Sequence, residues 1–486
     1  MNRAAQKRSG SFYTPDPIVS CLLSWAIRNP SDRLLDPSCG DGRFIVGHGN
    51  SVGVEHDLSA AQSASSRALS ATVHHSEFFA WASRTKERFE CAAGNPPFIR
   101  YQNFRGPVRE TALRLCSRVG ANFSGLTSSW ALFLVVTASL LKPGGRMAFV
   151  VPAEIGHAPY AAPLLDYLID NFAVVHIIAV REKMFPELSE DCWMLYAEGY
   201  TGKTKNISFS VQSHFKTTAR PPQRFTSISV REWSDVWRRR LRPYLISSHA
   251  RDLYRMAIEH PDACRLGDIA SVGIGYVSGA NEFFHLRPSE AEQWNIPKSS
   301  LHPTVRNGRS LPVGRLSERI VKDWYRTDEP ILLLRLPKTN NLSAAVLRYL
   351  NTDQGRAAQT AYKCRTRDPW YSVPDVQIPD FFLSYMSGIT PNLVFNAAGC
   401  TCTNSVHSLR VRDRRRVRHL VTAWDTSFVK LSCEIEGHAL GGGMLKVEPR
   451  EAAQIILPPR SLFPELVGPT VDNAIKTMRS WRHYAA

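Results

Sequence analysis

Four consecutive residues, Asn95-Pro96-Pro97-Phe98, are of the types that can bind a flat ring carrying an exocyclic amine. The side-chain carbonyl of Asn95 accepts hydrogen bonds. Pro96 has no N–H group, so a peptide carbonyl beside it can point outward without a competing donor. Phe98 offers an aromatic face for stacking. The alternative is an ordinary surface turn, because Asn-Pro is a common turn former, and the surrounding sequence decides between the two.

A glycine-rich turn upstream indicates a cofactor site. A short strand predicted at residues 33–36 ends in Asp36 and runs into the turn Pro37-Ser38-Cys39-Gly40-Asp41-Gly42 before a helical stretch. A strand followed by such a turn and a helix is the plan of a nucleotide-type cofactor site, and the glycines let the backbone approach the ligand closely. Because the acid is unsuited to a phosphate, the sequence favours a cofactor with a positive or neutral group here.

Acidic residues recur where the next two predicted strands end. Glu55 closes the second strand, where an acid can bind both hydroxyls of a ribose. Glu77 follows the third strand and could meet the exocyclic amine of an adenine. The fourth strand leads into Asn95. Ligands of open α/β sheets bind at the carboxyl ends of the strands, so we expect these signals to meet, although each acid alone could be a solvated surface carboxylate.

The first half of the chain alternates between strand-like and helical patterns. This alternation predicts an α/β fold with a mainly parallel sheet and helices on both of its faces. The further predicted helices cover residues 128–141 and 160–172, and the further predicted strands cover residues 146–151, 174–180, 191–199 and 206–211.

The charge, the length and the apolar runs of the chain indicate its class of partner, its number of domains and its location. The chain has 486 residues and a formal net charge of +17, which favours an anionic partner such as nucleic acid or an anionic membrane surface. The length suggests two to four domains. The longest mainly apolar run, residues 131–141, is too short to span a bilayer, and the polar, basic first residues do not form a signal peptide. We therefore expect a cytoplasmic protein without a membrane segment.

The ten cysteines show no paired spacing that would indicate disulfides or a metal site. Cys400 and Cys402 are close in sequence, but no second pair completes a zinc site. His407 nearby is expected to be solvated rather than a ligand. We expect no metal and reduced thiols throughout.

Two densely basic strips lie in the second half. One contains Arg238, Arg239 and Arg240, and the other contains Arg414, Arg415 and Arg416. Each strip could be a solvated surface, or it could contact the phosphates of DNA, which position a protein without reading sequence.

In its ordered motifs the first half resembles the S-adenosylmethionine-dependent amino-methyltransferases that act on N6 of DNA adenine, with the gamma-class motif order of type II restriction–modification systems. Phe12-Tyr13-Thr14-Pro15 is similar to the amino-terminal motif of that group, and residues 36–44 to its cofactor loop. Asn95-Pro96-Pro97-Phe98 is similar to the catalytic motif. Glu77 stands where the group more often has Asp. The resemblance covers about half of the chain at the level of motifs.

The resemblance implies a role for each motif. Asn95, Pro96 and Phe98 would be catalytic, with the adenine flipped out of the duplex. The residues that would bind S-adenosyl-L-methionine are Phe12, Tyr13, Thr14, Pro15, Asp36, Ser38, Cys39, Gly40, Glu55, Glu77 and Asn95.

The same resemblance implies a division of labour along the chain. Residues 1–215 would form a Rossmann-like class I methyltransferase domain, and residues 216–486 an α+β target-recognition domain that binds double-stranded DNA. Within the latter, residues 273–284 and 441–449 look like segments common to such domains, although both could be hairpin turns. We expect a stand-alone modification enzyme, with any cognate restriction endonuclease on a separate chain.

The sequence alone is also compatible with other functions. A protein-glutamine methyltransferase also uses an Asn-Pro-Pro-aromatic loop. RNA methylation and a catalytically inactive DNA-binding subunit are further alternatives. Cytosine-N4 enzymes usually carry Ser or Asp in place of Asn95, which favours adenine.

Overall fold

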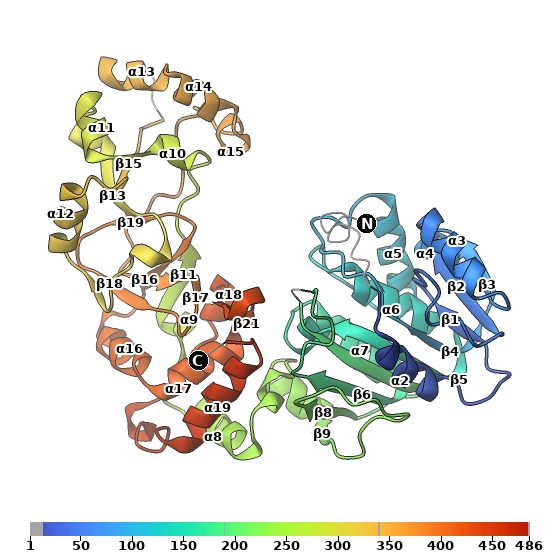
Figure 1. Cartoon of the computed structure of the whole chain (residues 1–486). Coiled ribbons are helices and arrows are strands. Elements are labelled where there is room, and N and C mark those ends of the chain that lie inside the picture. Colours follow the sequence, from blue (N-terminus) through green and yellow to red (C-terminus); the bar gives the residue numbers. More distant parts are fainter. Residues whose placement is uncertain (1–12, 189, 339–340, 485–486) are drawn as a thin grey trace. The chain divides into compact units, whose positions relative to one another are not determined.

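The computed structural model describes residues 13–188, 190–338 and 341–484. The chain divides into two compact units, the first ending at Ile246 and the second beginning at Ser247 (Figure 1). Among the described residues, no helix combines the length and the apolar character that a bilayer span requires.

One nine-stranded sheet organises the first unit, with the order β3-β2-β1-β4-β5-β7-β6-β8-β9. β7 and β9 run opposite to the other strands, so the predicted, mainly parallel α/β fold is confirmed. The strand order reverses between β1 and β4, which is where open α/β sheets bind ligands. The strands are β1 (Leu34–Asp36), β2 (Ser51–Glu55), β3 (Thr72–His75), β4 (Phe89–Gly94), β5 (Leu141–Pro152), β6 (Phe172–Val180), β7 (Cys192–Tyr200), β8 (Asn206–Gln212) and β9 (Thr226–Ser229).

Helices pack on the sheet as its apolar residues require. Strand residues alternate between two faces, and Leu34, Ala93 and Val150 share a core cluster with Ile18 and Leu22 of α2. α6 is buried over almost its whole length and packs with α5, α7 and β5. The helices are α2 (Asp16–Ala26), α3 (Leu58–Arg67), α4 (Phe78–Ala82), α5 (Pro107–Arg118), α6 (Ser129–Ser139) and α7 (Ala161–Asn171).

Residues 216–246 belong structurally to the first unit, although we grouped them with the second domain on sequence. β9 pairs antiparallel with β8, and the Trp233 side chain is fully buried. The sheet therefore extends past residue 215.

The second unit is α+β and contains several small sheets and short helices (Figure 1). Its largest sheet has the order β11-β20-β16-β18-β14, and distinct apolar clusters cover the Phe381 and Phe382 sides of β16. The strands are β10 (Cys264–Arg265), β11 (Ala270–Ile274), β12 (His285–Leu286), β13 (Leu301–Val305), β14 (Arg315–Leu316), β15 (Leu332–Leu334), β16 (Phe381–Ser384), β17 (Met386–Ser387), β18 (Leu393–Asn396), β19 (Thr401–Cys402), β20 (Val406–Val411), β21 (His438–Ala439), β22 (Leu445–Lys446) and β23 (Ile456–Leu457). The helices are α8 (Ser248–Glu259), α9 (Leu266–Ile269), α10 (Asn281–Phe284), α11 (Pro288–Gln293), α12 (Glu318–Arg326), α13 (Ala344–Leu350), α14 (Asp353–Thr360), α15 (Tyr362–Arg365), α16 (Val417–Trp424), α17 (Ser427–Glu436), α18 (Pro449–Ala452) and α19 (Pro469–Ser480).

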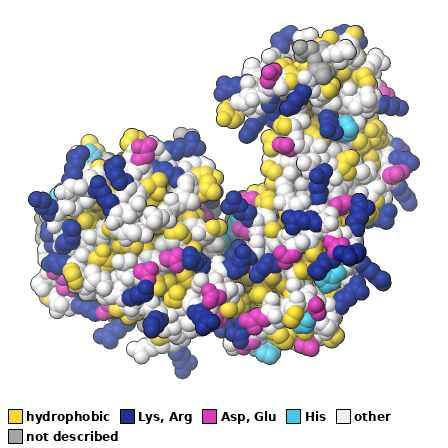
Figure 2. Space-filling model, turned by 180° about the vertical axis from the view of Figure 1, so that it is seen from behind, with side chains coloured by type: hydrophobic (Ala, Val, Ile, Leu, Met, Phe, Trp, Pro, Cys, Tyr) yellow, Lys and Arg dark blue, Asp and Glu magenta, His cyan; other side chains and the backbone are white. Residues whose placement is uncertain are grey.

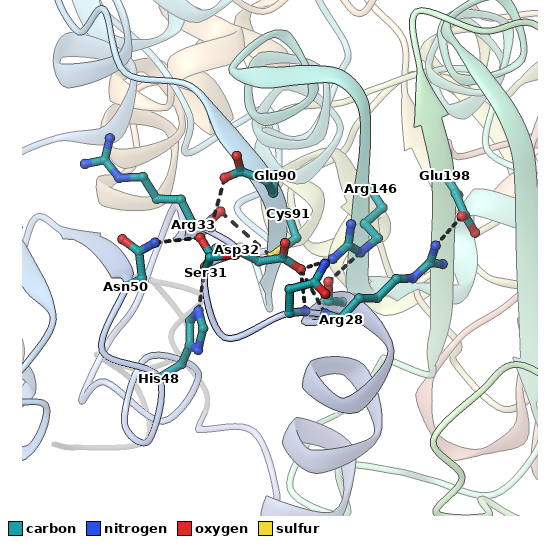
Figure 3. Close-up of polar contacts among 12 residues, drawn as sticks. Arg28, Ser31, Asp32, Arg33, His48, Asn50, Glu90, Cys91, Arg146 and Glu198 are labelled. Carbon is teal, nitrogen blue, oxygen red and sulfur yellow. Dashed lines mark hydrogen bonds and ion pairs between the residues drawn. The ribbon is translucent and has the colours of Figure 1, made fainter.

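A buried ion pair anchors α2 at the amino edge of the first sheet (Figure 3). The Arg146 guanidinium pairs with the Asp32 carboxylate and donates through Nε to the carbonyl of Ala26 at 2.6 Å. Asp32 also accepts from the backbone N–H groups of Arg28 and Asn29 at 2.9 and 3.1 Å. Burial alone would raise the pKa of Asp32, but these N–H groups and Arg146 outweigh it and lower the pKa. The last turn of α2 is thereby tied to β5 and to the start of β1.

Replacing Arg146 with Met is expected to destabilise the first unit by about 3–5 kcal/mol, because it strands the Asp32 carboxylate without its counter-charge. Urea unfolding measures the loss. The control is Arg28→Met, which removes an exposed ion pair to Glu198 (2.6 Å) and should cost only about 0–1 kcal/mol. Equal losses in the two variants would contradict the anchoring role of Arg146.

Candidate active site

The Asn95 side chain lies just beyond the carboxyl end of β4, held by the segment that precedes α2. Its Nδ2 donates to Thr14 Oγ1 at 3.2 Å. Its Oδ1 is buried and has no hydrogen-bond partner among the described residues. An acceptor in this state is one that a ligand's donor can satisfy.

Ser129, at the start of α6, fixes the residues that follow Asn95. The N–H of Ile99 donates to Ser129 Oγ at 3.0 Å, and Ser129 Oγ donates to the carbonyl of Pro97. The N–H of Ser129 donates to the carbonyl of Ile99 at 3.0 Å. Phe98 is half-buried and packs against the core cluster on the α2 side of the sheet. The hydrogen bonds to Ser129 and the packing of Phe98 therefore hold the proline-containing loop in place.

Asp36 is buried at the carboxyl end of β1, next to β4. Its Oδ1 accepts from the N–H of Ser38 at 3.0 Å, and its Oδ2 has no partner among the described residues. A Cβ at Gly94 would lie 2.7 Å from Asp36 Oδ1, so glycine is needed for this approach. Burial raises the pKa of Asp36 to about 8, and the negative charges of Glu55 and Asp41 add to the rise. A cation placed here would stabilise the ionised carboxylate.

Glu55, at the end of β2, is joined to the glycine-rich turn. Its Oε2 accepts from the N–H of Gly40 at 2.9 Å, and its Oε1 accepts from the N–H of Asp57 at 2.8 Å. Burial would raise the pKa of Glu55, but the bonds from His56, Asp57 and Gly40 lower it. Gly40 adopts φ +53°, a conformation in which glycine is the least strained residue. Oε1 also pairs with His56 Nδ1 at 2.9 Å, whereas Oε2 keeps a further lone pair for a ligand.

Glu77 lies where it was expected, after β3, and it caps α4. Its Oε1 accepts from the N–H of Phe79 at 3.0 Å and its Oε2 accepts from the N–H of Ala80 at 2.8 Å. The carboxylate is therefore fixed at the same sheet edge as Asp36 and Glu55, with both oxygens engaged at the helix start.

The turn after β1 contacts the Asn95 loop directly. Ser38 Oγ donates to the backbone carbonyl of Asn95 at 3.3 Å. Cys39 is buried, and a Cβ at Gly53 would lie 2.7 Å from its Sγ, so the thiol packs inside the unit. Burial raises the pKa of this thiol well above its usual value. Any contact of Cys39 with a cofactor is therefore expected from its backbone.

Arg43 joins the segment before α2 to the turn after β1. Its Nη1 donates to the carbonyl of Thr14 at 3.2 Å, its Nε pairs with Asp41 at 3.2 Å, and its guanidinium lies 5.2 Å from the centre of the Tyr13 ring. The Tyr13 ring also covers Gly40, where a Cβ would lie 3.8 Å from it. Pro15 caps α2 by accepting from the N–H of Ile18 at 3.0 Å. Phe12 lies outside the described residues.

Arg238, Arg239 and Arg240 do not form the helix face considered from sequence. Arg238 and Arg239 have φ of 51° and 63°, and Arg239 pairs with Asp166 at 2.7 Å. These contacts give Arg239 a structural role within the first unit.

Arg414, Arg415 and Arg416 form an exposed 3-10 turn capped by Asp413, which also pairs with Arg415 at 3.0 Å. Lys and Arg side chains are spread over the visible face of both units, among apolar and acidic ones (Figure 2). Contact between these arginines and DNA stays a prediction.

The expectation that His407 is solvated was wrong. His407 is fully buried and its Nε2–H donates to the carbonyl of Val447 at 2.6 Å. This bond joins β20 to the segment after β22, a long-range contact that local sequence does not encode. Within the described residues, no cluster of three or more His, Cys, Asp or Glu side chains could hold a metal ion.

Comparison with known proteins places the chain among modification enzymes. The family described as "Eco57I restriction-modification methylase" matches residues 50–185, and "Type II methyltransferase M.Eco57I, C-terminal domain" matches residues 238–485. The type II methyltransferase M.XamI of Xanthomonas campestris pv. amaranthicola is 23% identical over 93% of this chain and 85% of its own length. The type II methyltransferase M.AccI of Acinetobacter calcoaceticus is 20% identical over 92% of this chain and 84% of its own length. The type IIL restriction–modification enzyme MmeI, solved with DNA, shares the fold, with a TM-score of 0.52, 13% identity, and coverage of 93% of this chain and 70% of its own.

The buried carboxyl of Asp36 makes a pH dependence of stability testable. An unfolded Asp has a pKa near 3.9 and the folded group one of about 8. Between these values the folded state holds a proton that the unfolded state has lost, so this group lowers stability as pH rises. The Asp36→Asn variant should lack this slope. Its free energy of unfolding should therefore rise relative to that of wild type by up to about 1.4 kcal/mol for each unit of pH. Urea unfolding of both proteins at pH 6, 7 and 8 measures the difference in their free energies of unfolding. If that difference does not change with pH, the raised pKa of Asp36 is contradicted.

Proposed function

The chain belongs to the Eco57I family of type II restriction–modification methylases, and from this premise we propose that it methylates N6 of an adenine extruded from double-stranded DNA. It is a DNA methyltransferase, and S-adenosylmethionine is its cofactor. When bound, this cofactor supplies a methyl group on a positively charged sulfur. The choice of adenine and the flipping of the base are the parts that we propose.

The proposal is carried by Asn95 Oδ1, which is buried and lacks a hydrogen-bond partner within the described part of the chain. The lone pair of adenine N6 is delocalised into the ring, which makes the amine a poor nucleophile. Asn95 Oδ1 and the Pro96 carbonyl would accept its two N–H groups and draw the nitrogen toward tetrahedral geometry. Thr14 supports this role because it engages Nδ2 of the same amide. Positioning of this kind supplies a large part of a rate enhancement.

The residues around the turn after β1 fit the cofactor. Asp36 Oδ2, buried and without a partner in residues 13–188, 190–338 and 341–484, would bind the positively charged amino group of the amino-acid part. Glu55 would bind the ribose through the remaining lone pair of Oε2, and Glu77 would bind the adenine amine through the remaining lone pairs of its carboxylate. Tyr13 and Thr14 would close over the methionine end.

The DNA side of the proposal follows from the same site. An amine inside a duplex is out of reach, so the base must leave the stack, and Phe98 would stack on it. We assign contact with DNA to the second unit, including phosphate contacts by Arg414, Arg415 and Arg416. A cognate restriction endonuclease would be a separate chain.

The experiment that tests the function identifies the methylated nucleoside. The purified chain is incubated with methyl-labelled S-adenosylmethionine and unmethylated duplex DNA of mixed sequence, and the digested nucleosides are separated. We expect label in N6-methyladenine. Label in N4-methylcytosine would overturn the choice of adenine, and label only in RNA or protein supplied in parallel would overturn DNA as the substrate. No transfer by a chain that binds the cofactor in equilibrium dialysis would favour an inactive DNA-binding subunit.

A further inference from the structure

The turn that follows the catalytic loop is built as a rigid surface beside it. We infer that residues 100–105 hold the DNA strand next to the extruded adenine, with Arg105 contacting a phosphate that flanks the target nucleotide. This inference rests on the proposed function and adds the residues that grip the strand at the site itself.

The turn closes on itself and is anchored in the core. The N–H groups of Asn103 and Phe104 donate to the carbonyl of Arg100 at 2.9 and 3.0 Å. Phe104 is buried, and its ring centre lies 6.1 Å from that of Phe79 in α4. α4 is the helix that Glu77 caps, so the turn is coupled to the same sheet edge as the site.

Arg109, in α5, locks the turn from the other side. Its Nη1 donates to the carbonyls of Tyr101 and Phe104 at 3.2 and 2.9 Å, and its Nη2 donates to the carbonyl of Gly125. One guanidinium thus joins the turn to the segment that leads into α6. Because Ser129 of α6 fixes Ile99, the whole path from Asn95 to Phe104 is braced. A braced turn loses little further conformational entropy when it binds.

The side chains on this braced backbone suit a DNA strand. Arg100, Gln102, Asn103 and Arg105 are all exposed. Arg100 pairs with Glu190 at 2.9 Å, whereas Arg105 has no carboxylate partner among the described residues. An extruded nucleotide stays attached to its neighbours through its own phosphates, so these phosphates must lie at the rim of the loop that holds the base. Arg105, unpaired with any carboxylate of the described residues, is close to that loop in sequence, and phosphates suit a guanidinium.

Arg105→Ala tests the inference directly. With mixed-sequence duplex DNA and labelled S-adenosylmethionine, we expect the KM for DNA to rise about 3–10-fold, with most of the loss in KM rather than in kcat. The dependence of log affinity on log salt should weaken by about one. The matched control is Arg118→Ala, an exposed arginine in the last turn of the same helix as Arg109, which should leave both values unchanged.

A second variant tests the brace. Arg109→Lys keeps the positive charge but cannot reproduce the fork that binds three carbonyls. We expect a higher KM for DNA and an unchanged Kd for S-adenosylmethionine. If wild type methylates DNA and Arg105→Ala has the same KM for DNA and the same salt dependence as Arg118→Ala, only this inference is overturned. If wild type itself transfers no methyl group to DNA, the proposed function fails.

Discussion

The hydrogen bond from Asn95 Nδ2 to Thr14 Oγ1 is the contact on which the site depends, because it decides how the Asn95 amide is oriented. With Nδ2 engaged, Oδ1 stays buried and receives no hydrogen bond from the residues that the structure describes. Leaving such a group unpaired costs about 1–3 kcal/mol, and Asp36 Oδ2 adds a second one nearby. Two buried oxygens that lack partners among the described residues, at the carboxyl ends of adjacent strands, fit a site that binds ligands.

Helix α2 connects this site to the opposite edge of the sheet. Thr14 and Pro15 precede its first turn, and the carbonyl of Ala26 in its last turn accepts from buried Arg146. A helix fixed at its end and packed along the sheet presents Thr14 to Asn95 in one position. The ion pair of Arg146 with Asp32 thus stabilises the geometry of a site that it does not touch.

Sequence alone predicted the parts of the site that follow from local pattern. Asp36, Glu55, Glu77 and Asn95 end or follow parallel strands, and the geometry of such a sheet brings those ends together. Gly94 was not singled out, yet only glycine allows the Asp36 side chain so close.

The rest depends on contacts between distant residues, which no local pattern encodes. Thr14 and Asn95 are 81 residues apart, and Ile99 and Ser129 are 30 apart. The arginines at 238–240 looked like a helix face, but Arg239 turns back to pair with Asp166, 73 residues earlier. Composition shows that such residues are charged, and only the fold shows what neutralises them.

The role of Asn95 is tested most directly by the single-turnover rate of methyl transfer to duplex DNA by Asn95→Ala, measured with both cofactor and DNA saturating. We predict a fall of about 10²–10³-fold, as for the loss of one preorganised hydrogen-bonding group, while the Kd values for S-adenosylmethionine and DNA stay close to those of wild type. A transfer rate equal to that of wild type would contradict the assignment of the Asn95 carbonyl as the group that activates the target amine.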